Sequence, residues 1–519
     1  MSRTPRDPRE AGPAAARPAL APVVRLGEPA GRWVLVAAVL GSGIALLDAT
    51  VVNVALPTLG EDLGASLGGL QWTVNAYTLT LAALILLGGS LGDRFGRRRV
   101  FLVGVVWFAV ASLLCGAALS IGQLIAARAL QGVGGALLTP GSLAMIQASF
   151  HPDDRARAIG AWSALGGIAA AIGPFLGGWL VEAVSWRWVF LINAPLAVVI
   201  VVLALRHVPE TRDPTTHGRF DVAGAVLGAL ALGGITYALV EGEGGFAAPA
   251  VWGSAVVGVL GLVAFVVTER RGRNPMLPVD IFASRQFTAA NLVTFAVYAA
   301  LGGVFFFLVL NLQIVSGFTP IASGMALLPV TVLMLLLSER AGLLAQRIGP
   351  RLPMSAGPLV CAAGPLLLSG IGADATYVAS VLPGVVVFGL GLSLTVAPLT
   401  ATVLGAADVR HAGVASGVNN AVARAGGLLS VAALPLLVGL SGADYQDPAR
   451  FVEGFRMACY LCAGLLAAGG VVAAATISND VLSAGAPPAV ARPQPQCRTH
   501  CAVAGTPLEP SAEEPAVAR

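Results

Sequence analysis

A short polar interruption decides how this chain is organised. Residues 89–99 read GSLGDRFGRRR, so one aspartate and four arginines stand between two long apolar stretches. Short cytoplasmic loops of membrane proteins retain arginine and lysine, so a cluster of this kind marks the cytoplasmic side of a bilayer. The apolar sequence on each side of this loop is therefore expected to cross a membrane.

The composition extends this expectation to the whole chain. Of 519 residues, 56% are hydrophobic and 11% are charged, and the mean hydropathy is +0.82. A soluble domain carries about 25% charged residues, so this chain belongs in a lipid bilayer. The sequence contains no lysine, and a phosphate-binding loop of the Walker type needs one. We therefore expect no ATP hydrolysis, and we assign the chain neither a cofactor nor a nucleic-acid partner.

Fourteen stretches approach the roughly 20 apolar residues that a spanning helix needs. They lie near 32–56, 71–91, 100–118, 121–147, 156–181, 187–206, 221–241, 250–268, 288–312, 321–345, 351–371, 376–404, 411–440 and 454–477. Arginine-bearing loops alternate with acidic or neutral loops between them. This alternation predicts a multi-pass protein of the plasma membrane with both termini in the cytoplasm. The abundance of Gly and Ala suggests a GC-rich genome, and we expect a bacterial source.

The spans divide into two groups of six with two spans between them. Residues 346–351 (QRIGPR) echo residues 93–98 (DRFGRR) at the same relative place in the second half. Internal repeats of this kind are expected of transporter folds. The predicted units are disordered cytoplasmic tails at 1–31 and 478–519, six-helix bundles at 32–206 and 288–477, and a linker with two extra transmembrane helices at 207–287.

Asp48 is the sharpest candidate for chemistry, because it lies inside the first predicted span. A carboxylate at membrane depth is costly and by default marks a functional site. Burial favours the neutral form of a carboxyl group, so such a side chain is suited to taking up and releasing protons. The alternative is a structural carboxylate that caps a neighbouring helix.

Arg128 is the expected partner of Asp48. At about 1.5 Å per residue, Arg128 lies about 10 Å below the outer end of the fourth span, and Asp48 lies about 12 Å below that of the first. The agreement in depth predicts that the two side chains meet within the first half. We hypothesise that Arg128 stabilises the ionised acid and that a cationic substrate competes for the carboxylate.

Further polar residues within the spans could line a cavity, namely Asn53, Gln131, Asn419, Asn420 and Arg424. A drug site is expected to be large and apolar with few polar anchors. Glu339 and Arg340 are better explained as boundary residues whose charges reach the interface. No metal site is predicted, because the tail residues Cys497, His500 and Cys501 are fewer than the four ligands of a structural zinc site.

Motifs in order along residues 32–477 give the chain a resemblance to a known family. Residues 48–57 (DATVVNVALP) are similar to its first-helix motif, residues 89–99 to its loop between the second and third helices, and Arg128, Gln131 and Gly132 to its fourth-helix motif. Residues 173–178 (GPFLGG) resemble its antiporter motif, and residues 186–195 (WRWVFLINAP) its sixth-helix entry. The chain thus resembles the fourteen-span drug:proton antiporters of the major facilitator superfamily, the EmrB/QacA type.

The resemblance implies an all-α polytopic fold of two six-helix bundles plus two extra helices, and a transporter rather than an enzyme. It implies that Asp48 and Arg128 take part in proton coupling. It also implies a cytoplasmic gate at Gly89, Asp93, Arg94, Gly96 and Arg97, and an antiporter motif at Gly173, Pro174, Gly177 and Gly178.

Together these features predict proton-driven efflux of lipophilic drugs or antibiotics by alternating access. The expected partners are a small lipophilic substrate, protons and the lipid bilayer, and a monomer is expected. The main alternative is a dedicated exporter of a single endogenous metabolite, such as an antibiotic or a siderophore. An uptake symporter, a membrane-bound enzyme, a receptor and a channel are weaker alternatives. An enzyme would need a sizeable polar catalytic loop, and the longest internal loops show no paired carboxylates of that kind.

Overall fold

The chain is almost entirely helical where the structure describes it. The computed structural model describes residues 24–212, 221–242, 248–272, 277–407 and 412–482. Fourteen helices in these ranges are long and apolar enough to cross a membrane, and each overlaps one of the predicted stretches. The predicted all-α polytopic membrane fold is therefore confirmed.

The helices fall into three groups along the chain. The first comprises α1 (Pro29–Leu63), α2 (Leu67–Phe95), α3 (Arg97–Gly116), α4 (Ile121–Ser149), α5 (Pro152–Ala183), α6 (Trp188–Leu191) and α7 (Asn193–His207). The second comprises α8 (Val222–Glu241) and α9 (Pro249–Arg271), followed by the short turn η2 (Val279–Ala283). The third comprises α10 (Arg285–Ile314), α11 (Pro320–Ala326), α12 (Leu328–Ile348), α13 (Arg351–Leu368), η3 (Tyr377–Val381), α14 (Leu382–Gly405), α15 (Ala412–Leu437), η5 (Asp444–Gln446), α16 (Pro448–Thr476) and η6 (Asn479–Val481).

Two of the spans are interrupted near one end. Helices α6 and α7 together form one span, and α11 and α12 together form another. Pro195 and Pro329 follow these interruptions by two or three residues. Proline has no backbone N–H for the carbonyl four residues earlier, so the ladder of helical hydrogen bonds fails there. Hydropathy is continuous across both breaks, which is why the predicted spans did not show them.

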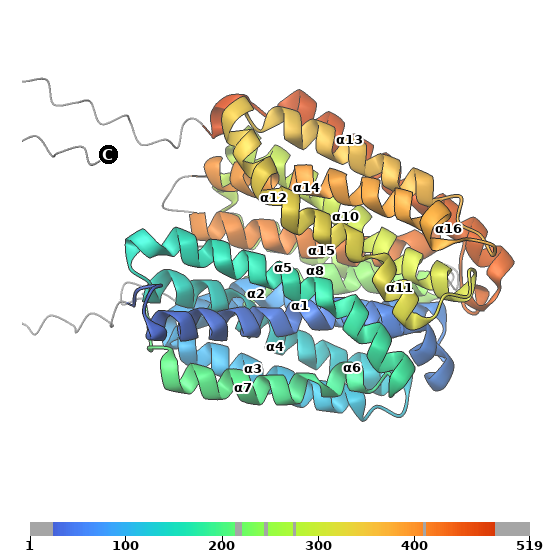
Figure 1. Cartoon of the computed structure of the whole chain (residues 1–519), viewed down its shortest axis with the longest axis horizontal. Coiled ribbons are helices and arrows are strands. Elements are labelled where there is room, and N and C mark those ends of the chain that lie inside the picture. Colours follow the sequence, from blue (N-terminus) through green and yellow to red (C-terminus); the bar gives the residue numbers. More distant parts are fainter. Residues whose placement is uncertain (1–23, 213–220, 243–247, 273–276, 408–411, 483–519) are drawn as a thin grey trace, which may run out of the picture.

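The first and third groups repeat one pattern of packing. In the first, α1 packs on α5 and α7, while α4 packs on α2 and α3. In the third, α10 packs on α15 and α16, while α14 packs on α12 and α13. Figure 1 shows the two groups as two layers, one blue to green and the other yellow to red. Between them in the chain, α8 and α9 pack on each other, and α8 contacts both α2 and α15.

The hydrogen bonds that join the two layers gather at one end of the molecule. Leu67 N donates to Gly442 O (2.9 Å), Tyr445 Oη donates to Ala65 O (2.7 Å), and Gln313 Nε2 donates to Val54 O (3.0 Å). We call this end the outer end, because the loop charges predict that it faces away from the cytoplasm. Among the described residues, no hydrogen bond between backbone groups joins the layers at the opposite end.

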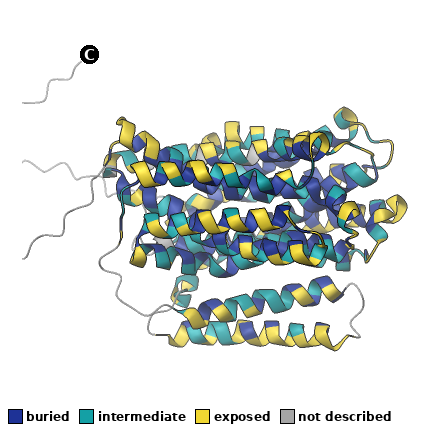
Figure 2. Cartoon of the chain, turned by 90° about the horizontal axis from the view of Figure 1, so that it is seen from below, coloured by how far each residue is buried: buried dark blue, intermediate teal, exposed yellow. Residues whose placement is uncertain are grey.

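The outside of the helices is apolar and exposed, as expected of a protein surrounded by lipid. Figure 2 shows exposed residues along the outward faces of the helices and buried residues toward the middle. Helix α9 is an extreme case, with Trp252, Val256, Leu260 and Val263 all more than half exposed. A soluble protein rarely leaves such patches open to water.

Close contacts between helices depend on glycine. A Cβ atom added at Gly134 on α4 would lie 2.7 Å from the backbone nitrogen of Phe108 on α3. At Gly122, near the start of the same helix, an added Cβ would meet nothing within 4 Å. An alanine at Gly122 therefore changes helix propensity alone, whereas an alanine at Gly134 also disturbs the packing of α4 on α3.

We expect Gly134→Ala to lower the free energy of unfolding by about 1–3 kcal/mol, because the new methyl group forces α3 and α4 apart. Gly122→Ala should leave stability unchanged or raise it slightly, since alanine favours a helix. Thermal unfolding of the two purified variants in detergent checks this. Equal melting temperatures for both variants would contradict it.

Candidate functional site

Asp48 lies near the middle of α1 and is completely buried, with an exposed fraction of 0%. Its carboxylate accepts hydrogen bonds on both oxygens. Arg128 Nη1 donates to Oδ2 (2.5 Å), and Gln131 Nε2 and Asn193 Nδ2 donate to Oδ1 (2.8 and 3.0 Å). Every contact is made by a donor, so this arrangement suits the ionised form of the acid.

Arg128 on α4 is buried as deeply, with an exposed fraction of 1%. Besides its bond to Asp48, Nη1 donates to Gln131 Oε1 (2.6 Å), and Nε donates to the carbonyl of Thr73 on α2 (3.0 Å). Its guanidinium carbon lies 4.4 Å from the centre of the Tyr77 ring. A buried ion pair is tolerated only when both partners are also hydrogen-bonded and packed in this way.

Ser112 on α3 completes the network. Its Oγ accepts from Gln131 Nε2 (2.7 Å) and from Asn193 Nδ2 (3.2 Å), and so holds both amides beside the acid. Gln131 and Arg128 lie three residues apart on α4 and therefore share one face of that helix. Asn193 is the first residue of α7, immediately after the break in the sixth span. The network thus draws on five segments of the first half.

The contact between Asp48 and Arg128 is the one that their depths in the sequence predict. Gln131, proposed as a cavity residue, is fully buried here and bonds Asp48 instead of facing an open space. Asn193 was recognised within a motif but not as a partner of Asp48, and Ser112 was not singled out. Both lie in the membrane-spanning part of the chain, so their polarity was the only available signal.

The candidate gate loop between α2 and α3 makes several contacts within its own half. Asp93 pairs with Arg97 one turn away, at 2.8 Å. Gly96 adopts a φ of 110°, a conformation that side chains rarely adopt. Gly89 lies next to Pro140 of α4, and Arg94 is exposed with its guanidinium over the ring of Phe95.

Residues after α7 fasten this loop. Glu210 Oε1 accepts from the backbone N–H of Arg98 (3.2 Å), and Glu210 Oε2 lies 3.7 Å from the Nε atoms of both Arg98 and Arg99. The N–H of Arg97 donates to Thr211 O (2.9 Å). Sequence reasoning missed Glu210, which falls in the predicted linker and belongs to no motif.

The residues of the antiporter motif lie where α5 crosses α1 and α11. A Cβ at Gly173 would collide with Thr50 Oγ1, and one at Gly177 would lie 2.8 Å from Val51 Cγ1, both on α1. A Cβ at Gly178 would lie 2.5 Å from Ile321 Cα on α11, in the other half. Pro174 also faces α11, where its carbonyl leaves no room for a side chain at Gly324.

The polar residues of α15 do not form a compact network like that of Asp48. Asn419 Nδ2 donates to Thr294 Oγ1 (2.7 Å) and Asn291 Oδ1 (3.3 Å) on α10, while Asn420 is exposed and bonds its own helix. Arg424 is half-buried at the middle of α15, and no described carboxylate pairs with it. Asn53 on α1 bonds only the carbonyl of Ala49 (3.4 Å) among the described residues.

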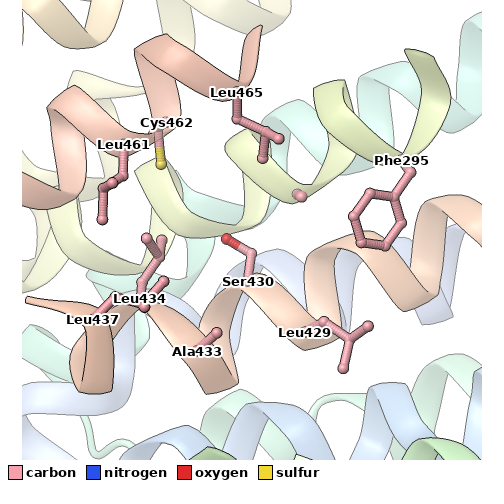
Figure 3. A pocket seen from close by; sticks show the side chains of 10 residues that line it. Phe295, Leu429, Ser430, Ala433, Leu434, Leu437, Leu461, Cys462 and Leu465 are labelled. Atoms are coloured by element: carbon pink, nitrogen blue, oxygen red, sulfur yellow. The ribbon is translucent and has the colours of Figure 1, made fainter. Parts of the chain in front are cut away.

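One apolar pocket of about 300 Å³ lies between α10, α15 and α16. Figure 3 shows its leucines, Phe295 and Cys462 around a single hydroxyl group, that of Ser430. None of the predicted site residues lines it. The described residues also contain no cluster of ligands that could hold a metal ion, and Cys497, His500 and Cys501 lie outside the described residues.

Fourteen membrane-capable helices, two similarly packed halves and a charged network buried at membrane depth define a polytopic membrane transporter. The sequence profile described as Major Facilitator Superfamily matches residues 38–431. The chain belongs to the Major Facilitator Superfamily, and its fourteen helices fit the fourteen-span EmrB/QacA-type arrangement. It is a transporter of this superfamily and not an enzyme.

The chain is similar over most of its length to curated bacterial proteins. It is 38% identical to the puromycin resistance protein pur8 of Streptomyces alboniger, over 82% of this chain and 86% of that protein. It is 36% identical to the methylenomycin A resistance protein of Bacillus subtilis, over 84% and 93% of the two chains. It is also 36% identical to the tetracenomycin C resistance and export protein of Streptomyces glaucescens, over 78% and 75%.

Solved structures share the fold at much lower identity. A peptide transporter POT in complex with sulfate superposes with a TM-score of 0.64 at 15% identity, over 88% of this chain and 96% of that one. A bacterial homologue of the lysosomal transporter Spinster, inward-facing and unoccupied, gives 0.61 at 16% identity, over 86% and 97%. These matches show the fold alone.

We expect Arg128→Leu to lower the free energy of unfolding by about 3–5 kcal/mol at neutral pH, because it leaves a buried carboxylate without its cation. A cycle with Asp48→Asn isolates the pair, and the double variant should lose less than the sum of the single variants.

The control for this cycle is Arg187→Leu. Arg187 Nη1 pairs with Asp62 Oδ2 at 2.9 Å, but the two side chains are 32% and 49% exposed. An exposed pair contributes about 0–1 kcal/mol. Chemical or thermal unfolding in detergent measures all variants, and equal losses for Arg128→Leu and Arg187→Leu would contradict the special cost of the buried pair.

Proposed function

We propose that this chain exports lipophilic drugs or antibiotics from a bacterial cytoplasm across the plasma membrane, in exchange for protons. The support for the cargo comes from relatives that are named for resistance to puromycin and methylenomycin A and for resistance to and export of tetracenomycin C. The support for the proton comes from the site. A solitary carboxylate buried among donors is the kind of group that can hold a proton in one conformation and lose it in another.

The observation that carries the proposal is the complete burial of Asp48 together with Arg128. Neither side chain touches solvent in this conformation, so neither a proton nor a substrate reaches the acid until the helices around it separate. Protonation would cancel the attraction between the pair and leave Arg128 bonded to the Thr73 carbonyl and Gln131. Binding of the proton is thereby linked to a rearrangement of α1 against α4.

Close packing offers a route from Asp48 to the contact between the halves. Thr50 and Val51 follow Asp48 on α1 and touch Gly173 and Gly177 of α5. One residue further along α5, Gly178 rests on the backbone of α11 in the other half. A displacement of α1 therefore moves α5, and α5 cannot move without disturbing the outer end.

Alternating access follows if the two layers rock about the central region while their outer ends part. In this proposal residues 32–206 and 288–477 are the two moving units, residues 207–287 join them, and a monomer suffices. Both termini lie in the cytoplasm, where the loop of Asp93 and Arg94 latches the gate when the outer end opens. A membrane potential supplies about 2.3 kcal/mol per proton for each 100 mV.

Arg424 is the proposed anchor for cargo in the second half, with Asn419, Asn420 and Asn53 as further polar positions. An arginine in the middle of a span without a paired carboxylate is costly. A carbonyl, phenol or acidic group on the substrate would complete its hydrogen bonds. The sequence-based idea of a cation that competes for Asp48 needs a conformation in which that acid is exposed.

A dedicated exporter of one endogenous metabolite remains the alternative, because relatives with different named compounds share similar identity to this chain. Susceptibility of cells with and without this gene to puromycin, methylenomycin A and tetracenomycin C separates the two. Resistance to several compounds supports broad efflux, and resistance to none of them favours a dedicated exporter.

We expect Asp48→Asn to abolish proton-driven accumulation of puromycin in inverted vesicles, because the amide cannot take up a proton. Asp48→Glu should keep part of the activity. Asp62→Asn makes the same change near the outer end of the same helix and should transport like the unaltered chain. Full accumulation by Asp48→Asn would rule out coupling through this residue.

We expect Gly178→Ala to loosen the outer end, because its methyl group would lie 2.5 Å from the Ile321 backbone. Ser323→Cys, at a buried position on α11, serves as a reporter in a chain stripped of its other cysteines. Labelling by a membrane-impermeant maleimide should rise several-fold with Gly178→Ala. Gly160→Ala, where nothing lies within 4 Å of the added atom, should leave labelling unchanged, and equal labelling of both variants would refute the expectation.

A further inference from the structure

The network around Asp48 contains one buried acceptor that nothing uses. Asn193 directs its Nδ2 toward Asp48 Oδ1 (3.0 Å) and Ser112 Oγ (3.2 Å), while its own Oδ1 is buried without a hydrogen-bond partner among the described residues. A buried carbonyl oxygen without a partner carries a substantial cost. Because this oxygen lies beside the candidate proton site, a function in proton binding would explain why the cost is tolerated.

A protonated Asp48 would need an acceptor that the present arrangement does not offer. The neutral acid carries one O–H donor, and it would face three donors from Arg128, Gln131 and Asn193. Arginine has no acceptor at all. Gln131 Oε1 already accepts from Arg128 Nη1 (2.6 Å) and from the thiol of Cys115 (3.8 Å). Of the three side chains that donate to the acid in the described part of the chain, only Asn193 has a carbonyl oxygen that is unengaged.

We infer that the side-chain amide of Asn193 turns over when Asp48 takes up a proton, so that this one residue stabilises both protonation states of the acid. This inference rests on the proposed proton coupling and names the group that makes the neutral state of Asp48 tolerable. Asn193 acts through Asp48 and is a positioning residue.

The turn reverses the hydrogen bonds without moving the backbone. An amide rotated by half a turn exchanges its oxygen and nitrogen, which places Oδ1 about where Nδ2 now lies. The proton on Asp48 Oδ1 then lies between that oxygen and Asn193 Oδ1. Ser112 can follow, because a hydroxyl that now accepts from Asn193 Nδ2 can donate to Oδ1 instead. The position that Asn193 Oδ1 now occupies has no hydrogen-bond partner. After the turn Nδ2 occupies it, also without a partner. The cost of one buried polar atom without a hydrogen bond is therefore similar in both states.

Other charged or titratable groups near Asp48 cannot take this part. Arg128 from α4 is a permanent cation, and Tyr77 from α2 stacks against its guanidinium. Cys115 from α3 directs its thiol at Gln131. Arg424 lies on α15 in the other half and is a permanent cation. The Tyr77 hydroxyl is buried without a partner, but no hydrogen bond joins it to Asp48 among the described residues, whereas Asn193 already bonds the acid.

Comparison with Gln131 tests the inference, because the two residues are expected to shift the titration midpoint of Asp48 in opposite directions. Both amides donate to the same oxygen of Asp48 and to the same Ser112 hydroxyl. Only Asn193 has a free carbonyl, so only its loss removes the acceptor for the protonated acid. Leucine is similar in shape to asparagine and can neither donate nor accept a hydrogen bond. It therefore removes the hydrogen-bonding groups when it replaces either amide.

The experiment is a pH titration of Asp48 by infrared difference spectroscopy on the full chain in lipid membranes. The C=O stretching band of the protonated carboxyl group reports the neutral acid, and its disappearance in Asp48→Asn assigns the band. We expect Asn193→Leu to move the titration midpoint to lower pH, because the ionised acid keeps its donors Arg128 and Gln131 while the neutral acid loses its only acceptor. Gln131→Leu should move it to higher pH, because the carboxylate loses a donor.

Asn311→Leu is the matched control, since Asn311 is a buried asparagine on α10 in the other half that bonds neither Asp48 nor its partners among the described residues, and its midpoint should equal that of the unaltered chain. A rise or no change in the midpoint of Asn193→Leu overturns the inference, because an amide that merely supports the carboxylate or the packing would behave like Gln131. Should either leucine variant fail to fold, Asn193→Ala and Gln131→Ala carry the same opposite signs.

The titration also separates this inference from the proposed function, because it needs no transport. A band that titrates with opposite shifts in a chain that exports nothing would refute drug:proton exchange and leave the role of Asn193 standing. Export with parallel shifts would refute the role of Asn193 alone. If no Asp48 band forms at any pH at which the chain stays folded, proton coupling through Asp48 and the role of Asn193 both fail.

Discussion

The structure of the first half depends on keeping one carboxylate stable where no water reaches it. Asp48 achieves this by accepting from Arg128, Gln131 and Asn193, and those donors are fixed by Ser112 and by the carbonyl of Thr73. The contacts bind α1, α2, α3, α4 and α7 to one another through a single acid. Removing a partner exposes the cost of an unpaired charge, so the chemistry of the site and the stability of the bundle cannot be separated.

The two halves repeat their packing but not their chemistry. Helices α1 and α10 occupy corresponding places in the two halves. Each is the first span of its half and packs on the fifth and sixth spans of that half. In place of an acid, the described part of the second half offers Arg424, with no carboxylate paired to it. An acid that binds protons in one half and a cation that can hold cargo in the other would let each half respond to a different ligand. Their shared contact at the outer end, through the glycines of α5 and α11, would make those responses interdependent.

The sequence predicted those features that depend on distance along a helix. Fourteen spans could be placed because length and hydropathy suffice to recognise them. Asp48 and Arg128 could be paired because residue spacing gives depth directly. The break in the helix before Asn193 was not predicted, because hydropathy is continuous there and only the missing N–H of Pro195 indicates it. Ser112, Asn193 and Glu210 could not be assigned partners, because their contacts depend on how separate helices are rotated about their axes. Gln131 shows the same limit, since the sequence does not distinguish a polar residue that faces a cavity from one that bonds a neighbouring acid.

The pair α8 and α9 has a consequence for the surrounding membrane. Helix α8 contacts α2 of one half and α15 of the other, while α9 presents almost nothing but apolar surface to lipid. If the halves rock as proposed, α8 would slide along at least one of them, and α9 would displace lipid as it follows. Each transport cycle would then do mechanical work on the bilayer, and the turnover rate would vary with acyl-chain length and with lateral pressure.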